Sequence, residues 1–290
     1  MQAGNASIAH VQRAVGRHIS HARKALARPQ LDDEAVHAAR KDLKRARSGL
    51  RLLRSLNETA YRRENTRLRN AARRLSPVRD DKVLLAKLTE LIADQKRPAR
   101  RRLLVQARKD VRNARRRDWR ALRSPQELER IDEALASAAK RVRKWRSTSQ
   151  GPDDAAPELA VQRLFRKGRK ALKRSREDPS DECLHEARKQ AKHLAQALEI
   201  LAGRKPPKKT AKLLARADDL GDWLGDDHDL AVVESRCLSL PADADKPKRK
   251  IARRLEKRRA KLQDKALDAG RKLFRGKTKH VLDSISPAIS

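Results

Sequence analysis

An apolar seam flanked by a line of cations in residues 36–54 constrains the fold of this chain most strongly. Apolar residues recur at alternating spacings of three and four, as in a helix that packs against other helices, at Val36, Ala39, Leu43, Ala46, Leu50 and Leu53. One position after each of these stands a side chain that can carry positive charge, at His37, Arg40, Lys44, Arg47, Arg51 and Arg54. Because one residue is about 100° of helix rotation, this basic stripe lies beside the seam and not opposite it. The pattern favours a helix that lines a groove, and the alternative is a solvated basic face.

The composition supports a protein that binds a polyanion. The chain has 74 Lys and Arg against 38 acidic residues, a formal net charge of +36. Self-repulsion at this charge opposes compactness, and a polyanionic partner would relieve it. Such a composition is compatible with helices or with disorder, and the regular seams favour helices.

Helical periodicity recurs along the chain, whereas no segment shows the alternation typical of a β-strand. We therefore predict an all-α fold of antiparallel helical bundles. Expected helices cover residues 7–27, 36–54, 59–75, 80–95, 99–123, 124–145, 159–173, 184–201, a segment from 208 onward, 248–274 and 279–285. Ser76-Pro77 is expected to end the third helix, and the glycine-containing segment 220–225 is expected to form a turn.

Two matches at nearly the same offset indicate an internal duplication. His185, Arg188 and Lys192 repeat His37, Arg40 and Lys44 after 148 residues, and the segment from Leu224 repeats that from Leu75 after 149 residues. Residues 147–157 lack periodicity and are rich in turn formers. We predict one domain, residues 1–290, built from a first half (1–146), a linker (147–157) and a second half (158–290). If the halves pack about a pseudo-two-fold axis, their basic stripes share a central groove.

The chain has two cysteines at no metal or redox spacing, no apolar run of signal-peptide length and no stretch approaching a membrane span. We expect a soluble cytoplasmic protein that does not bind membranes. Its oligomeric state does not follow from the sequence.

The paired segments HAARKDLKRAR and HEARKQAK, each followed by a helix that leads to an aspartate-containing segment, resemble the CHAD family, the "conserved histidine α-helical domain". The resemblance covers nearly the whole chain. It implies a bundle of antiparallel helices that binds inorganic polyphosphate in a basic central groove, with some members found on polyphosphate granules. It also implies that His37 and His185 are the histidines after which the family is named. The polyphosphate-binding residues that we predict are His37, Arg40, Lys41, Lys44, Arg47, Arg51, Arg13, Arg17, His185, Arg188, Lys189, Lys192, Arg163, Lys167 and Lys170.

Two other functions compete with polyphosphate binding. Nucleic acid is a competing polyanion, although the six aromatic residues provide little base stacking and no base-reading motif is recognised. A metal-dependent polyphosphate-processing enzyme is the second alternative, with the run Asp226, Asp227, His228 and Asp229 as a Mg²⁺ site or, instead, a helix N-terminus. We expect a binding protein without catalytic residues, metal or cofactor.

The histidines raise two further questions. His18 and His21 lie close together but lack the partner spacing of a zinc site, so we interpret them as part of a basic face. An imidazole at His37 or His185 with a pKa near its usual 6.5 would strengthen anion binding as the pH falls.

Overall fold

The computed structural model describes residues 2–145, 157–203, 205–240, 245–276, 278 and 281. Its regular elements are ten α-helices, and no strand occurs among the described residues, which confirms the all-α prediction. In chain order they are α1 (Gln2–Leu26), α2 (Asp33–Leu52), α3 (Glu58–Arg74), α4 (Ser76–Ala93), α5 (Pro98–Leu122), α6 (Pro125–Arg143), α7 (Pro157–Glu177), α8 (Asp181–Ala202), α9 (Lys208–Leu238) and α10 (Asp245–Leu273). No described helix combines the length and apolar character needed to cross a bilayer. All of the expected 279–285 helix except residue 281, and most of the 147–157 linker, lie outside the described residues.

Capping side chains and prolines set several helix starts. The Asp32 carboxylate accepts the Ala35 amide at the start of α2, and the Asn57 side chain accepts the Ala60 amide at the start of α3. Pro98 and Pro125 begin α5 and α6, where the missing N–H is not needed.

The two halves differ at the position of Pro77. In the first half only Leu75 separates α3 from α4, so the fourth helix begins at Ser76 and not at the predicted residue 80. The proline ring clashes with the carbonyl four residues back, which breaks the helix there. At the corresponding place, 149 residues later, the chain has Asp226, and α9 continues without a break. The predicted turn over 220–225 is therefore wrong, as is the reading of Asp226 as part of a helix N-terminus.

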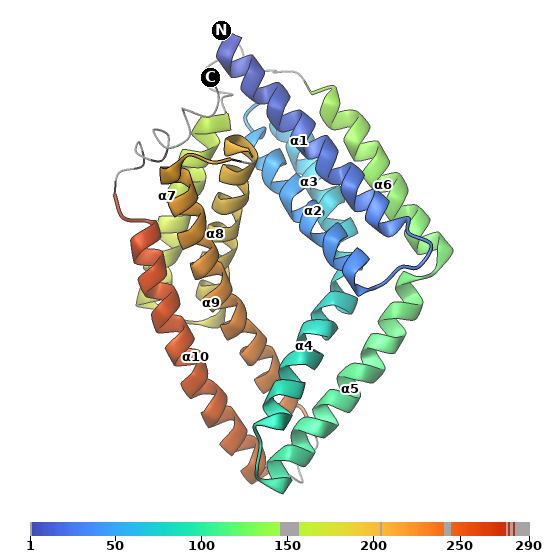
Figure 1. Ribbon diagram of the computed structural model, residues 1–290, viewed down its shortest axis with the longest axis vertical. Coiled ribbons are helices and arrows are strands. Elements are labelled where there is room, and N and C mark those ends of the chain that lie inside the picture. Colours follow the sequence, from blue (N-terminus) through green and yellow to red (C-terminus); the bar gives the residue numbers. More distant parts are fainter. Residues whose placement is uncertain are drawn as a thin grey trace.

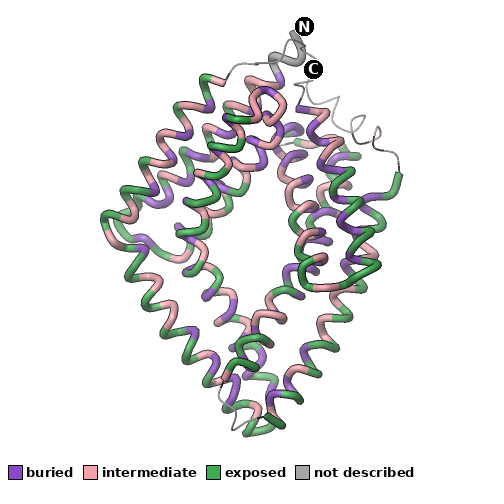
Figure 2. Tube along the Cα trace, turned by 180° about the vertical axis from the view of Figure 1, so that it is seen from behind, coloured by how far each residue is buried: buried purple, intermediate pink, exposed green. Residues whose placement is uncertain are grey.

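Two apolar cores hold the helices together, and both are shared by the two halves. The larger core joins α1, α2, α3, α6, α7 and α8, with one end each of α9 and α10. The smaller core joins α4 and α5 of the first half to α9 and α10 of the second. Figure 1 shows these four helices converging at the end of the molecule opposite the N-terminus, and Figure 2 shows buried stretches alternating with exposed ones along them. Among the described residues, each of the two cores contains residues of both halves.

The C-terminal parts of α2 and α8 meet near the middle of the larger core. There the Ser48 hydroxyl donates to the Gln196 side-chain oxygen at 2.7 Å, and these residues are 148 positions apart. A residue that touches its own counterpart lies close to the axis relating two copies, so this contact fits the proposed duplication, which itself stays a prediction. The apolar seam of α2 is buried as expected.

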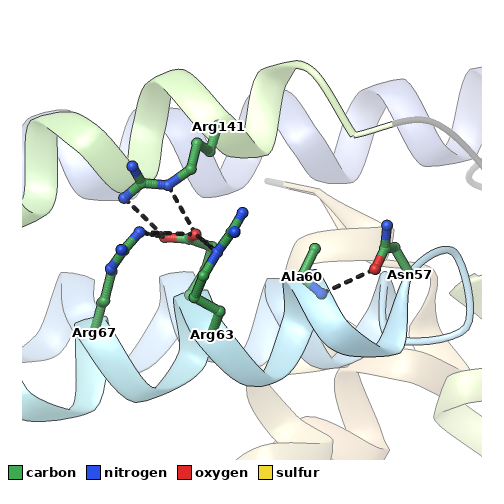
Figure 3. Close-up of polar contacts among 6 residues, drawn as sticks. Asn57, Ala60, Arg63, Arg67 and Arg141 are labelled. Atoms are coloured by element: carbon green, nitrogen blue, oxygen red, sulfur yellow. Dashed lines mark hydrogen bonds and ion pairs between the residues drawn. The ribbon is translucent and has the colours of Figure 1, made fainter.

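A buried carboxylate fixes α6 to α3. Glu64 has a fully buried side chain, and it accepts hydrogen bonds from Arg63 and Arg67 of α3 at 2.9 and 3.1 Å. Arg141 of α6 reaches the same carboxylate at 2.8 Å, as Figure 3 shows. A buried charge is tolerated only when it is paired, and three arginines supply that pairing.

We predict that Glu64→Ala lowers the free energy of unfolding by about 3 kcal/mol, the low end for breaking a buried ion pair, because the arginines can turn toward solvent. Urea unfolding followed by circular dichroism measures the change. Glu133→Ala, an exposed acid on α6, is the control. An equal, small effect of both substitutions would contradict the structural role of Glu64.

Candidate functional site

A pocket of about 380 Å³ lies between α2 and α8 and is lined almost entirely by basic side chains. Six of its nine lining residues are Lys or Arg, two are His and one is Gln: Lys44, Arg47, Arg51, His185, Arg188, Lys189, Lys192, His193 and Gln196. Packing of the two apolar seams brings the adjoining basic stripes together. The sequence predicted this juxtaposition.

A second pocket, of about 450 Å³, continues from the first. It is lined by the end of α2, the 53–57 loop, α3, α7 and α8, and it shares Arg51 and His193 with the first pocket. Arg163 and Lys167 of α7 line it, as does Tyr61 of α3. We call the two adjoining pockets the basic groove. It is lined by nine of the predicted residues: Lys44, Arg47, Arg51, Arg163, Lys167, His185, Arg188, Lys189 and Lys192.

The cations of the α2 wall are not paired with acids among the described residues, although Asp80 acts on Lys44 through space and Glu58 lines the second pocket. Among the described residues, Lys44, Arg47 and Arg51 form no ion pair, whereas Arg40, Arg45 and Arg54 of the same segment do. Burial, followed by repulsion from Arg40 and Arg188, lowers the pKa of Lys44 from 10.5 to about 8. Burial and the neighbouring Arg51 lower the pKa of Arg47 from 12.5 to about 10. Burial and neighbouring cations therefore disfavour the charged forms of the side chains in this wall.

The α8 wall is partly neutralised by acids of α9. Lys192 Nζ lies 3.3 Å from Asp218 Oδ1 and 3.0 Å from Asp222 Oδ1. At the corresponding positions of the first half, 149 residues earlier, the chain has Arg69 and Arg73. The repeated sites therefore differ in sign, and the first half carries the stronger positive charge.

Glycines in α9 allow the basic side chains of α8 to lie across it. A Cβ at Gly221 would stand 2.2 Å from Lys192 Cε, and one at Gly225 would stand 3.1 Å from an Arg188 nitrogen. Arg188 also donates to the Gly221 carbonyl at 3.3 Å. The glycines predicted to form a turn thus serve close packing inside a continuous helix.

Six predicted residues lie outside the two pockets. Arg40 donates to Ser76 and to Asp80, so it holds α2 against the α3–α4 junction. His37 Nδ1 accepts a hydrogen bond of 2.9 Å from Arg79. The other four are exposed on their helices: Arg13, Arg17, Lys41 and Lys170. Their participation in binding stays a prediction.

Some groove residues were missed in the sequence. The predicted stripe consists of the residues that follow each seam residue, and after Leu194 that residue is Ala195. His193 of α8 precedes Leu194, on the other flank of the seam, so the stripe does not include it. Arg69 and Arg73 of α3 act on Arg47 through space. Their spacing of four places them on one face of α3, but the sequence does not say that this face is turned toward α2.

Three histidines near the groove have lowered pKa values. Burial lowers the pKa of His37, helped by Arg79, and lowers that of His185, helped by His228. His193 is affected most, because burial and then Arg51 lower its pKa to about 2. His37 and His185 are therefore expected to strengthen anion binding only at a pH below the usual pKa of histidine.

The run 226–229 does not form a converging cluster. Asp227 is buried and pairs with Arg259 at 3.0 Å, whereas Asp226 is exposed and lies 4.0 Å from Lys87. Among the described residues, the group of side chains close enough to hold a metal ion is a different one, His18, His21 and Asp42.

We predict that Lys44→Gln increases the free energy of unfolding at pH 7 in the absence of a ligand. Although the Lys44 side chain is exposed to solvent, the surrounding groups desolvate its amine enough to lower the pKa, so folding disfavours the charged form. This penalty is complete below pH 8 and disappears as the pH rises from 8 to 10.5, so the gain over wild type should shrink over that range. Denaturant unfolding at pH 7 and 9.5 measures it.

The control for this substitution is Lys109→Gln, which removes an exposed lysine from α5, away from the groove. If Lys44→Gln stabilised the protein no more than this control at pH 7, the repulsion in the α2 wall would be disproved.

Comparisons with known proteins identify the family. The CHAD domain model matches residues 13–238. The solved structure of the CHAD domain from the plant Ricinus communis is similar, with 21% identity, a TM-score of 0.56, and coverage of 94% of this chain and 92% of that one. PptA from Streptomyces chartreusis is similar with 15% identity, a TM-score of 0.63, and coverage of 93% and 98%. No curated protein matches the chain. These structural likenesses support the fold, and the family match shows that this chain belongs to the CHAD family.

Proposed function

We propose that this protein binds inorganic polyphosphate in the basic groove. The observation that carries this proposal is the α2 wall, where Lys44, Arg47 and Arg51 form no ion pair among the described residues and burial, joined by neighbouring cations at Lys44 and Arg47, lowers their pKa values. A polyanion would restore the missing negative charge. The likeness to the CHAD family points to the same class of ligand.

The chemistry of the wall suits a chain of phosphates. Each phosphate carries about one charge and offers oxygens but no ring or base edge. Arginine makes forked contacts with phosphate oxygens, and lysine provides a point charge. One helical turn of about 5.4 Å separates successive cations of the stripe, so the cations form a ladder along an extended polyanion.

The groove is less suited to nucleic acid. Single-stranded nucleic acids are held by aromatic side chains that stack on the bases. Among the described residues, Tyr61 is the one Phe, Trp or Tyr that lines the two pockets, and Arg54 lies 5.4 Å from the centre of its ring. Nucleic acid binding is therefore the outcome that the experiment must distinguish.

In this function the protein binds polyphosphate and does not catalyse a reaction on it. A protein with this groove is expected to collect where polyphosphate accumulates, including polyphosphate granules. The spread of Asp226 and Asp227 around α9 favours binding over a Mg²⁺-dependent reaction on the polymer.

The test is a titration of the full chain with long-chain polyphosphate, duplex DNA and RNA at 150 mM salt. We expect wild type to bind polyphosphate most tightly. Arg47→Ala with Arg51→Ala should weaken polyphosphate binding by at least about tenfold, since a hydrogen bond to a charged group contributes about 1.5–3 kcal/mol.

The matched control is Arg112→Ala with Arg116→Ala, which removes two exposed arginines, also four residues apart, from α5. It should reduce binding much less than the groove pair. Equal losses from both pairs, or tighter binding of DNA than of polyphosphate by wild type, would refute the proposal.

The acids of α9 give a prediction in the opposite direction. Asp218→Asn with Asp222→Asn frees Lys192, so polyphosphate should bind about fivefold more tightly, corresponding to roughly 1 kcal/mol, the upper range for exposed ion pairs. The salt dependence of binding should also become steeper. Fluorescence titrations at several salt concentrations measure both.

Glu129→Gln with Glu133→Gln is the control for this change, because it removes two exposed acids four residues apart from α6. If the two pairs increased affinity equally, net charge alone would explain the effect and the pairing of Lys192 would have no role.

A further inference from the structure

The structure brings two histidines and an aspartate of different helices together outside the basic groove. His18 Nδ1 lies 2.7 Å from Asp42 Oδ1, and His21 Nδ1 lies 4.0 Å from the same oxygen. One ligand atom of each residue lies within 4.8 Å of those of the other two. We propose that His18, His21 and Asp42 bind a divalent transition-metal ion, with zinc as the reference ion.

The donor set fits this class of ion. Imidazole nitrogen binds zinc at about 2.0–2.1 Å and carboxylate oxygen at about 2.0–2.2 Å. Three protein ligands leave the fourth tetrahedral position for water. Magnesium and calcium prefer oxygen ligands, so two imidazoles favour zinc, nickel, cobalt or copper over them.

Helix geometry explains how the three residues meet. His18 and His21 are three residues apart, so they lie on one face of α1 and differ by less than one turn. Asp42 precedes the seam residue Leu43 of α2, whereas Lys44 follows it. The aspartate and the basic stripe therefore lie on opposite flanks of the α2 seam, and none of the three cluster residues is among those that line the groove.

The partners of Asp42 are unusual for this chain. In a protein with 74 Lys and Arg, its ion-pair partners within 4.0 Å among the described residues are the two histidines. The Asp42 side chain is 16% exposed and that of His18 is 22% exposed, so the pair is held in place by its surroundings. His21 is 60% exposed and can turn toward an entering ion. The site is thus partly preformed and open to solvent.

Metal binding would replace the hydrogen bond between His18 and Asp42 by two coordination bonds. The nitrogen that binds the metal must be unprotonated, so a proton on His18 Nδ1 moves to the other ring nitrogen or to solvent. Affinity should consequently fall as the pH falls. Because the bonds are coordinate rather than ionic, added NaCl should weaken zinc binding far less than polyphosphate binding.

The experiment is a zinc titration of the full chain, free of polyphosphate, against a chromogenic chelator at pH 7.5. We expect one zinc ion per chain. His21→Ala should weaken binding by more than about tenfold, since loss of even an outer-shell partner weakens metal sites by about 10–100-fold. The imidazole NMR signals of His18 and His21 should shift on addition of zinc.

Ser20→Ala is the matched control, because it truncates an exposed side chain of α1 that lies between the two histidines in the sequence and can donate no imidazole. It should leave zinc affinity unchanged. Since His21 is exposed, its substitution is not expected to unfold the protein, and circular dichroism checks this. Absence of zinc binding by wild type, or unchanged affinity in both His18→Ala and His21→Ala, would overturn the proposal and leave the cluster as a hydrogen bond joining α1 to α2.

Discussion

Repulsion between cations at the contact of α2 and α8 is the constraint on which the account of this protein depends. The two helices meet through apolar seams, and the stripe beside each seam is brought into the same space. Lys44 and Arg47 are desolvated there and lie close to other cations, so their pKa values fall first because of burial and then because of repulsion. The apolar cores, which are shared by both halves, provide the stabilisation that holds these charges together. This arrangement is the basis of the proposal that the groove binds a polyanion.

The same constraint explains why the two walls differ. The first half keeps Arg69 and Arg73 beside its stripe, whereas the second half has Asp218 and Asp222 at the corresponding positions. Because acids stand beside the α8 stripe where arginines stand beside the α2 stripe, the repulsion between cations is weaker at the α8 wall. In the proposed binding mode, α2 therefore supplies most of the binding strength, and Lys192 contributes only when its acids are removed or displaced.

The seams predicted the helices and the meeting of the basic stripes, because burial of apolar side chains decides both. The structure differs from the prediction where a single residue determines whether a helix continues or how closely two helices pack. Asp226 in place of Pro77 lets α9 continue, and Gly221 makes room for a lysine instead of forming a turn. Arg40 looked like a member of the stripe but contacts the α3–α4 junction. Asp42 could not be paired with the histidines of α1 because the relative rotation of two helices is not encoded in the spacing of either one.

Proton uptake on polyphosphate binding tests the central claim most directly. If the polymer relieves repulsion in the groove, the pKa of Lys44 rises from about 8 toward its usual value, and binding at pH 8.5 takes up protons. Calorimetric titration in two buffers of different ionisation enthalpy measures this uptake. The account predicts net uptake by wild type and a clear reduction in Lys44→Gln. Tight binding with no proton uptake, or with uptake unchanged by Lys44→Gln, would show that the polyanion binds elsewhere.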